Sequence, residues 1–163
     1  MMLDGTALDP RQLRDAFGRF ATGVTVVTML DDEGRPTGVT VNSFSSVSLT
    51  PALCLFSLGK EQVSCRWLRE GSHFTVNILA AHQEDIAWGF ARPRDDKFEG
   101  VPRGDGSFGV PYIDGSLCHF ECRFWAKYDG GDHDIILGEV LNFKELGGEP
   151  MVFYKGAIAA LPE

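Results

Sequence analysis

Apolar and polar positions along this chain change mainly at the two-residue period of β-strands, with short helical stretches between them. Alternating or continuous apolar runs bounded by Gly, Pro and Asp predict strands. These runs lie at residues 23–30, 37–41, 51–58, 73–79, 117–129, 133–145 and 151–161. The run at 51–58 is continuous and short, so we expect it to be buried on both faces. Strands joined by tight turns predict a mainly β fold, an antiparallel barrel that is closed or nearly closed.

Three segments show helical features instead. Asp9 and Pro10 form a helix start, and Leu13, Phe17 and Phe20 then recur at helical spacing. Further helices are expected within 60–71, closed by a glycine, and from 82 to the proline at 93, whereas 99–115 is rich in Gly, Pro and Asp and should be an extended loop. We expect a single domain over 1–163, with the N-terminal helix at about 10–22 and the barrel at about 23–161.

Composition narrows the classes of partner. The chain has 15 basic and 23 acidic residues, a net charge of −8, and 44% apolar residues. This balance argues against nucleic acid or an anionic membrane as the partner, because both are recognised by clustered Lys and Arg. No apolar run approaches the ~20 residues that span a bilayer. The N-terminus lacks the basic flank and apolar stretch of a signal peptide, so we expect a cytoplasmic protein.

The four cysteines stand in apolar surroundings. Cys118 and Cys122 belong to an alternating segment that predicts a half-buried strand with both thiols on its apolar face. Four residues of strand separate them by roughly 13 Å, too far for a disulfide. Cys54 lies in a continuous apolar run and Cys65 in an expected helix. We interpret all four as buried thiols in a reducing compartment.

The segment from Gly38 to Pro51, GVTVNSFSSVSLTP, is rich in small polar residues beside an apolar strand. A flavin ring has a donor and acceptor edge that backbone amides and short hydroxyl or amide side chains can satisfy, and its phosphate needs several donors. The segment is therefore a candidate flavin site. Taken alone, it is also explained by a solvated turn.

Two shorter motifs could complete such a site. Ser57, Lys60 and Ser64 surround the entry to an expected helix, where free N–H groups and a lysine charge can hold a phosphate. Ordinary capping with a solvated lysine explains them too. His133 lies in a Gly-Gly-Asp turn between two strands, where binding groups concentrate, although a lone turn histidine is also typical of an exposed surface. No histidines show metal-ligand spacing, so we expect no metal site.

The motifs TGVTVVT, GVTVNSFSSVSLTP, FSLGKEQVS, GGDHDIILGEV and GGEPMVFYKG occur in one order along the chain. Together they closely resemble the flavin reductase component of two-component flavin-dependent monooxygenases, from roughly Leu13 to Leu161. The resemblance implies an antiparallel split β-barrel of the FMN-binding type, usually a homodimer, with FMN or FAD against the barrel.

The resemblance also implies roles for individual residues. The residues that border the flavin ring are Thr40, Val41, Asn42 and Ser43. The phosphate side is formed by Ser57, Lys60 and Ser64. The loop that closes over the flavin contributes Phe90, Arg92, Lys97 and Phe98. His133 is expected beside the nicotinamide as the catalytic residue that positions it, with Tyr154 near the same pocket.

By this resemblance the chain is an NAD(P)H:flavin oxidoreductase that passes a hydride from NADH or NADPH to FMN or FAD. Reduced flavin then diffuses to a separate oxygenase. Two alternatives are a non-enzymatic flavin-binding electron carrier and a split-barrel FMN oxidase that acts on a small substrate. The sequence leaves open the choice of flavin and of nicotinamide.

Overall fold

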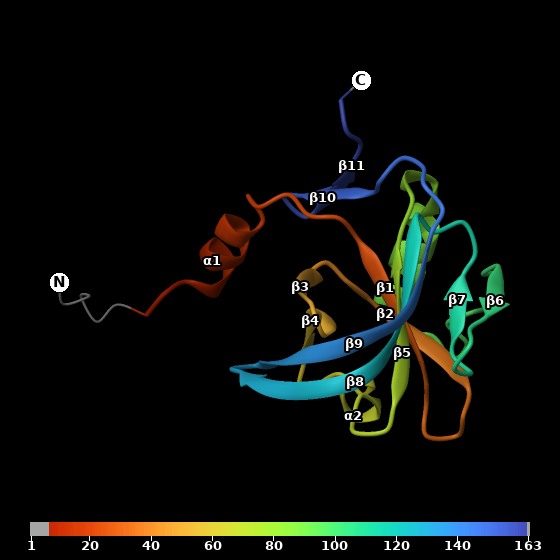
Figure 1. Ribbon diagram of the computed structural model, residues 1–163. Helices are drawn as coiled ribbons and strands as arrows, with labels where there is room; N and C mark the ends of the chain where they lie inside the picture. The colour runs from red at the N-terminus through yellow and green to blue at the C-terminus, as the bar shows by residue number, and fades with distance from the viewer. Residues whose placement is uncertain (1–6, 163) are drawn as a thin grey trace.

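Seven strands form one antiparallel sheet, with the spatial order β2-β1-β5-β8-β9-β4-β3. The computed structural model describes residues 7–162. The strands of this sheet are β1 (Thr25–Leu30), β2 (Pro36–Val41), β3 (Ser45–Leu49), β4 (Ala52–Gly59), β5 (His73–Ile78), β8 (Cys118–Gly130) and β9 (His133–Glu145). The sheet bends strongly, and its edge strands β2 and β3 do not pair with each other (Figure 1). The mainly β class and the open, split form of the barrel are confirmed.

The long strands β8 and β9 form a hairpin that projects from the body of the molecule (Figure 1). The turn at its tip contains Gly131, whose φ is 83°, a conformation that glycine adopts without strain. His133 pairs there with Gly130 of β8 and with Gly59 of β4. The predicted strands at 117–129 and 133–145 are thus confirmed to within one residue.

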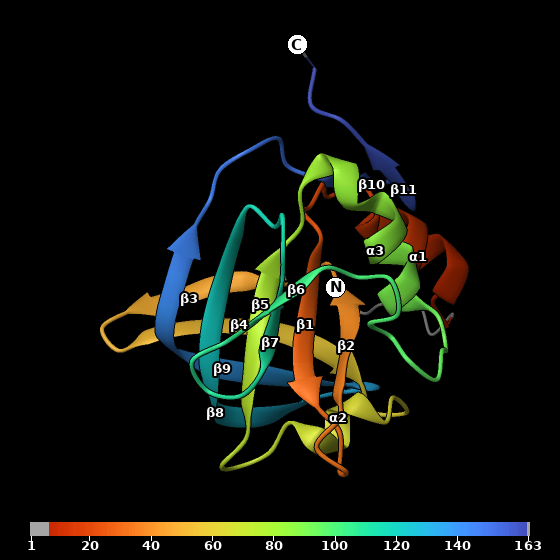
Figure 2. The same cartoon turned by 90° about the vertical axis from the view of Figure 1, so that its right-hand side faces the viewer.

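The expected extended loop at 99–115 is wrong in part, because it contains the two-stranded hairpin β6 (Arg103–Asp105) and β7 (Pro111–Ile113). This hairpin crosses in front of β5 and β8 (Figure 2). Asn77 Oδ1 accepts a hydrogen bond of 2.9 Å from the backbone N–H of Ile113, and Thr28 Oγ1 donates one of 2.6 Å to the carbonyl of Pro111. These partners lie far away in sequence, which is why local composition does not show the pairing.

The last expected strand, at 151–161, is also corrected. It is a short hairpin of β10 (Val152–Tyr154) and β11 (Ala157–Ala159). The turn places Lys155 and Gly156 at φ of 51° and 75°, which interrupts any continuous strand.

The N-terminal helix α1 (Pro10–Phe17) begins where predicted, since Asp9 accepts hydrogen bonds from two backbone N–H groups of its first turn. It ends at Phe17 rather than near residue 22, and a turn follows. No residue of α1 is buried. The helix lies away from the sheet, so its apolar side does not pack on the core of this chain (Figure 1).

The other helices are short. The expected helix within 60–71 is reduced to α2 (Ser64–Trp67), preceded by turns. The predicted helix before the proline at 93 is confirmed as η1 (Ala81–Gln83) followed by α3 (Glu84–Ala91). Helix α3 packs against β2 (Figure 2).

Two apolar clusters fill the interior. The first lies inside the curved sheet and includes Met29, Phe56, Leu58, Phe74 and Ile136. The second lies beneath α3 and includes Val26, Leu79, Phe90, Phe98 and Met151. Strand β4 contributes only alternate residues to the core, so the expectation of burial on both faces is wrong.

The cysteines are buried and free, as predicted. The alternation of buried and exposed residues expected along β8 is not observed, because His119 and Glu121 are buried as well as the two thiols. The β6–β7 hairpin covers their face of the strand: the Tyr112 ring stacks on His119, and the backbone N–H of Ser107 donates a hydrogen bond to Glu121 Oε1. Among residues 7–162, no helix is long and apolar enough to cross a membrane.

Candidate functional site

The polar segment from Gly38 to Pro51 runs along β2, turns at Asn42 and Ser43, and returns as β3. Ser43 ties this turn to β4, because its Oγ accepts a hydrogen bond of 2.9 Å from the Ser57 N–H and donates one of 3.2 Å to the Ser57 carbonyl. Thr40 Oγ1 donates a bond of 2.6 Å to the carbonyl of Ala87 in α3. These bonds fix the backbone of the segment, while Asn42 remains exposed.

A small hollow of about 190 Å³ opens beside this turn. Its lining is mostly apolar and consists of Val24, Thr40, Asn42, Ala87, Trp88, Ala91, Phe153 and Ile158. Apolar walls with two polar side chains at one border suit the edge of a planar aromatic ring.

A larger hollow of about 1020 Å³ lies between the β1–β2 turn, α2 and the loop after α3. We call it the cationic cavity because five basic side chains line it, against three carboxylates. The basic residues are Arg35, Arg92, Arg94, Lys97 and Arg103, and the acidic ones are Asp31, Asp95 and Asp96. Ser64 and Phe90 also line it, so four predicted site residues meet here. Both hollows border on Ala91.

Lys97 is held in a defined position in this cavity. Its Nζ donates hydrogen bonds of 3.0 and 2.6 Å to the carbonyls of Phe90 and Arg92, at the end of α3. Burial lowers the pKa of Lys97, and the charge of Arg94 lowers it further. A lysine held in this way gains from an anion in the cavity, which would offset the cost of its desolvation.

Phe90 and Phe98 support the wall of the cavity. Their rings pack edge to face with centroids 5.1 Å apart, and both side chains are buried. Phe90 also lies directly against Gly38. Val41, another predicted ligand residue, is buried in the first cluster, so only its backbone is available to a ligand.

Lys60 does not line the cationic cavity; it lies at the tip of the β8–β9 hairpin. Its Nζ forms an ion pair with Asp129, which raises the pKa of Lys60 and lowers that of Asp129. Its backbone N–H donates a bond of 3.0 Å to the carbonyl of Asp132. The predicted phosphate residues Ser57, Lys60 and Ser64 are therefore divided among three places.

His133 lies at the same tip, and half of its side chain is exposed (51%). Its Nδ1 is 2.7 Å from Asp132 Oδ1, and this contact lowers the pKa of the aspartate. A carboxylate only accepts hydrogen bonds, so Nδ1 carries the proton and Nε2 remains for a ligand. Of the two aspartates that flank His133 in the sequence, Asp132 is therefore the one that orients the imidazole in this structure.

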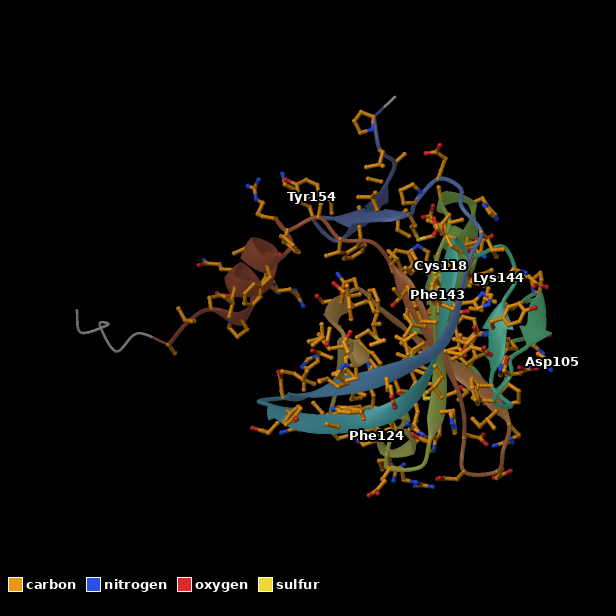
Figure 3. The ribbon with its side chains drawn as sticks, in the orientation of Figure 1. Asp105, Cys118, Phe124, Phe143, Lys144 and Tyr154 are labelled. Carbon is orange, nitrogen blue, oxygen red and sulfur yellow. The ribbon has the colours of Figure 1, made fainter. Side chains whose placement is uncertain are left out.

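Tyr154 lies in β10, away from the tip of the β8–β9 hairpin (Figure 3), and it does not line the cationic cavity. Its ring is partly exposed, and Lys155 Nζ lies 5.4 Å from the ring centroid. The prediction also did not assign Arg35, Arg94 and Arg103. The sequence features that could have indicated these residues are the run of charged residues after α3 and the charged turn after β1. Among residues 7–162, no cluster of His, Cys, Asp and Glu could hold a metal ion.

Known proteins resemble this chain over most of its length. The family described as "Flavin reductase like domain" matches residues 17–162. The reductase component of a flavin-dependent trigonelline monooxygenase from Acinetobacter baylyi is 46% identical over 90% of this chain and 47% of its own length. FMN reductase (NADH) SmoA of Agrobacterium fabrum is 44% identical over 90% of this chain and 83% of its own length.

Solved structures agree with these sequence matches. The NADH:FAD oxidoreductase of Streptomyces globisporus, in complex with NAD and FAD fragments, superposes with a TM-score of 0.89 at 40% identity, covering 97% of this chain and 98% of that one. The chain spans about half the length of some curated relatives, including the Acinetobacter protein. Since the family profile covers nearly all of the described residues, this chain belongs to the flavin reductase-like family.

Proposed function

We propose that this chain is an NADH-dependent flavin reductase that reduces FMN or FAD. The observation that carries the proposal is the match to relatives that align over most of both chains and are named for this activity. These relatives are the Agrobacterium FMN reductase (NADH) and the Streptomyces globisporus NADH-dependent FAD reductase.

The described residues fit a flavin nucleotide. The small apolar hollow beside Thr40 and Asn42 would take the edge of the ring, and the cationic cavity that adjoins it would take the phosphate. Lys97 and Arg92 would bind this phosphate, with Ser64 at the cavity wall. The backbone around Asn42 and Ser43 would supply donors to the polar edge of the ring.

When both cofactors are bound, they supply the hydride chemistry themselves. The protein must hold the two rings at a reactive distance and favour the negative charge that grows on the flavin. His133 would position the nicotinamide through Nε2, with Asp132 fixing the imidazole. No residue needs to act as a general base.

We also propose that reduced flavin leaves this protein for a separate oxygenase, in the cytoplasm where NADH is produced. Relatives that are named reductase components of flavin-dependent monooxygenases support this proposal. The openness of the cationic cavity between two loops and a short helix supports it too, because the flavin must be able to leave.

A homodimer is part of the same proposal. Several large apolar side chains are strongly exposed, including Phe17 (71%), Phe20 (79%) and Leu49 (94%). They belong to α1, the turn after it and β3, all outside the core of this chain. A second copy would cover them. Light scattering after size exclusion should give twice the chain mass, and a monomeric mass would contradict the dimer.

The activity is tested by mixing purified protein with NADH or NADPH and free FMN or FAD, and following the loss of nicotinamide absorbance. We expect NADH to be oxidised only when flavin is present. No oxidation with any pairing would contradict the proposal and favour a flavin-binding carrier.

His133→Ala tests the assignment of the nicotinamide site. The apparent KM for NADH should rise by about tenfold or more, because one oriented hydrogen bond is lost. The flavin Kd should stay unchanged. His82→Ala is the matched control, since His82 lines neither hollow. An equal loss of flavin and NADH binding in His133→Ala would contradict this role.

A further inference from the structure

Only some of the basic side chains in the cationic cavity form ion pairs with carboxylates. Arg35 pairs with Asp31 at 3.0 Å and with Glu33 at 3.6 Å, and Arg94 lies 3.4 Å from Glu99. The other three basic residues of the cavity have no carboxylate within ion-pair distance in the part of the chain that the structure describes. These are Arg92, Lys97 and Arg103. Asp95 and Asp96 also line the cavity, so its five basic and three acidic side chains leave an excess of positive charge that an anionic ligand can match.

Different parts of the structure hold these three side chains in position. Lys97 is bound to backbone carbonyls at the end of α3, and Arg92 adjoins it. Arg103 belongs to β6, and its guanidinium lies 5.2 Å from the centroid of the Phe98 ring. An anion bound by Lys97 and Arg92 would leave Arg103, which lines the same cavity, for a second anionic group.

The cavity is also larger than one phosphate requires. Its volume of about 1020 Å³ is slightly above the usual range for small-molecule sites, about 300–1,000 Å³. Trp67 of α2 lines it together with Gln62 and Val63. Trp67 is partly buried and packs against the first apolar cluster, and the part of its ring that lines the cavity could stack on a nucleobase.

We propose that the cationic cavity binds the adenosine diphosphate moiety of FAD, and that Arg103 makes this chain select FAD over FMN. The inference rests on the proposed flavin reductase function and deepens it. Lys97 and Arg92 bind the phosphate next to the ribityl chain, Arg103 binds the second phosphate, and the adenine lies against Trp67.

Total charge does not distinguish the two flavins. The phosphate monoester of FMN carries about −1.5 to −2 near neutral pH, as other phosphate monoesters do. The diphosphate of FAD carries a similar charge, divided between two phosphates. Selectivity must therefore come from the position of the second cation and from the stacking surface, both of which the cavity supplies.

The test measures the Kd of riboflavin, FMN and FAD for the apoprotein by fluorescence titration, without turnover. We expect the wild type to bind FAD about tenfold more tightly than FMN, as one charge-assisted hydrogen bond provides. In Arg103→Ala this ratio should fall close to one, while the Kd values of FMN and riboflavin stay within about twofold. ADP should displace FAD from the wild type and lose this effect in the variant.

Controls separate selectivity from folding. Arg103→Lys keeps the charge and should keep most of the preference for FAD. Lys144→Ala removes an exposed cation from β9, outside the cavity, and should leave the ratio unchanged (Figure 3). An unchanged Tm and FMN Kd in Arg103→Ala show that the site still folds.

Three results would overturn the proposal. The first is equal affinity of the wild type for FMN and FAD, and the second is a ratio that survives Arg103→Ala. The third concerns NADH, which carries the same adenosine diphosphate moiety: a raised KM for NADH in Arg103→Ala with an unchanged FAD-to-FMN ratio would assign the cavity to NADH. A selective protein that oxidises no NADH would contradict only the proposed function, because the binding test needs no turnover.

Discussion

The cationic cavity and the tip of the β8–β9 hairpin each hold a lysine that the sequence assigns to the flavin. Lys60 at the tip pairs with Asp129, and its backbone is bonded to Asp132. Within residues 7–162, the only hydrogen-bond partners of Lys97 Nζ in the cavity are the carbonyl oxygens of Phe90 and Arg92. The pKa of Lys60 is raised by its carboxylate, whereas burial lowers that of Lys97.

The role of each lysine therefore depends on the charged groups that surround it. Lys60 already has its counter-charge in Asp129, and we propose that its contacts hold the hairpin tip and the backbone next to His133. Lys97 is partly desolvated without a counter-charge, so an anion binds there with a larger gain. The two regions divide the work that we propose: flavin phosphate in the cavity, nicotinamide at the tip.

The largest effect is expected from a pair of glycine substitutions, one in each region. A Cβ at Gly38 would lie 2.9 Å from the carbonyl oxygen of Val27 and 3.0 Å from the Phe90 ring. Gly38→Ala should lower the free energy of unfolding by about 1–3 kcal/mol through overpacking. At Gly59 the nearest atom, in the Gln62 side chain, is 3.8 Å away. Gly59→Ala should therefore leave the free energy of unfolding almost unchanged in urea denaturation. An equal decrease in both variants would contradict this difference in packing between the cavity and the hairpin tip.

A second pair tests the two lysines directly. Lys97→Ala should raise the FMN Kd about tenfold, equivalent to about 1.4 kcal/mol, because a charged phosphate donor is lost. Lys60→Ala should leave the FMN Kd within about twofold and instead raise the KM for NADH, because the hairpin tip is released. Fluorescence titration and steady-state kinetics measure the two quantities. The reverse pattern would exchange the roles of the two regions.

The smallest effect is a pH dependence of flavin binding. Because the pKa of Lys97 is lowered from 10.5, this residue loses its proton at lower pH than a free lysine. The folded apoprotein bears the cost of the buried charge at neutral pH, and this cost disappears as pH rises through the lowered pKa. As pH rises, FMN affinity should therefore begin to fall before pH 10.5 is reached, because Lys97 loses its positive charge.

Lys97→Arg supplies the control for this measurement, since arginine stays protonated. Its FMN affinity should remain flat over the same interval. A flat profile in the wild type would show that Lys97 does not bind the phosphate.

Much of the fold follows from local patterns. The Asp9 cap, the long strands on both sides of Gly131 and the end of α3 before Pro93 depend on neighbouring residues, and each was predictable. The two short hairpins were not, because β7 is held by Asn77 and Thr28, whose positions are known only when the sheet has formed.

Local sequence specifies which chemical groups this protein carries: a polar segment along β2 and β3, a histidine in a tight turn, and charged residues after α3. How these groups are distributed over the molecule depends on the tertiary structure. It placed Lys60 beside Asp129 and away from the cavity, and it joined Arg35, Lys97 and Arg103 around one hollow. Coulomb interactions depend on distance in space, and pairing of the strands brings together charges that are far apart in the sequence.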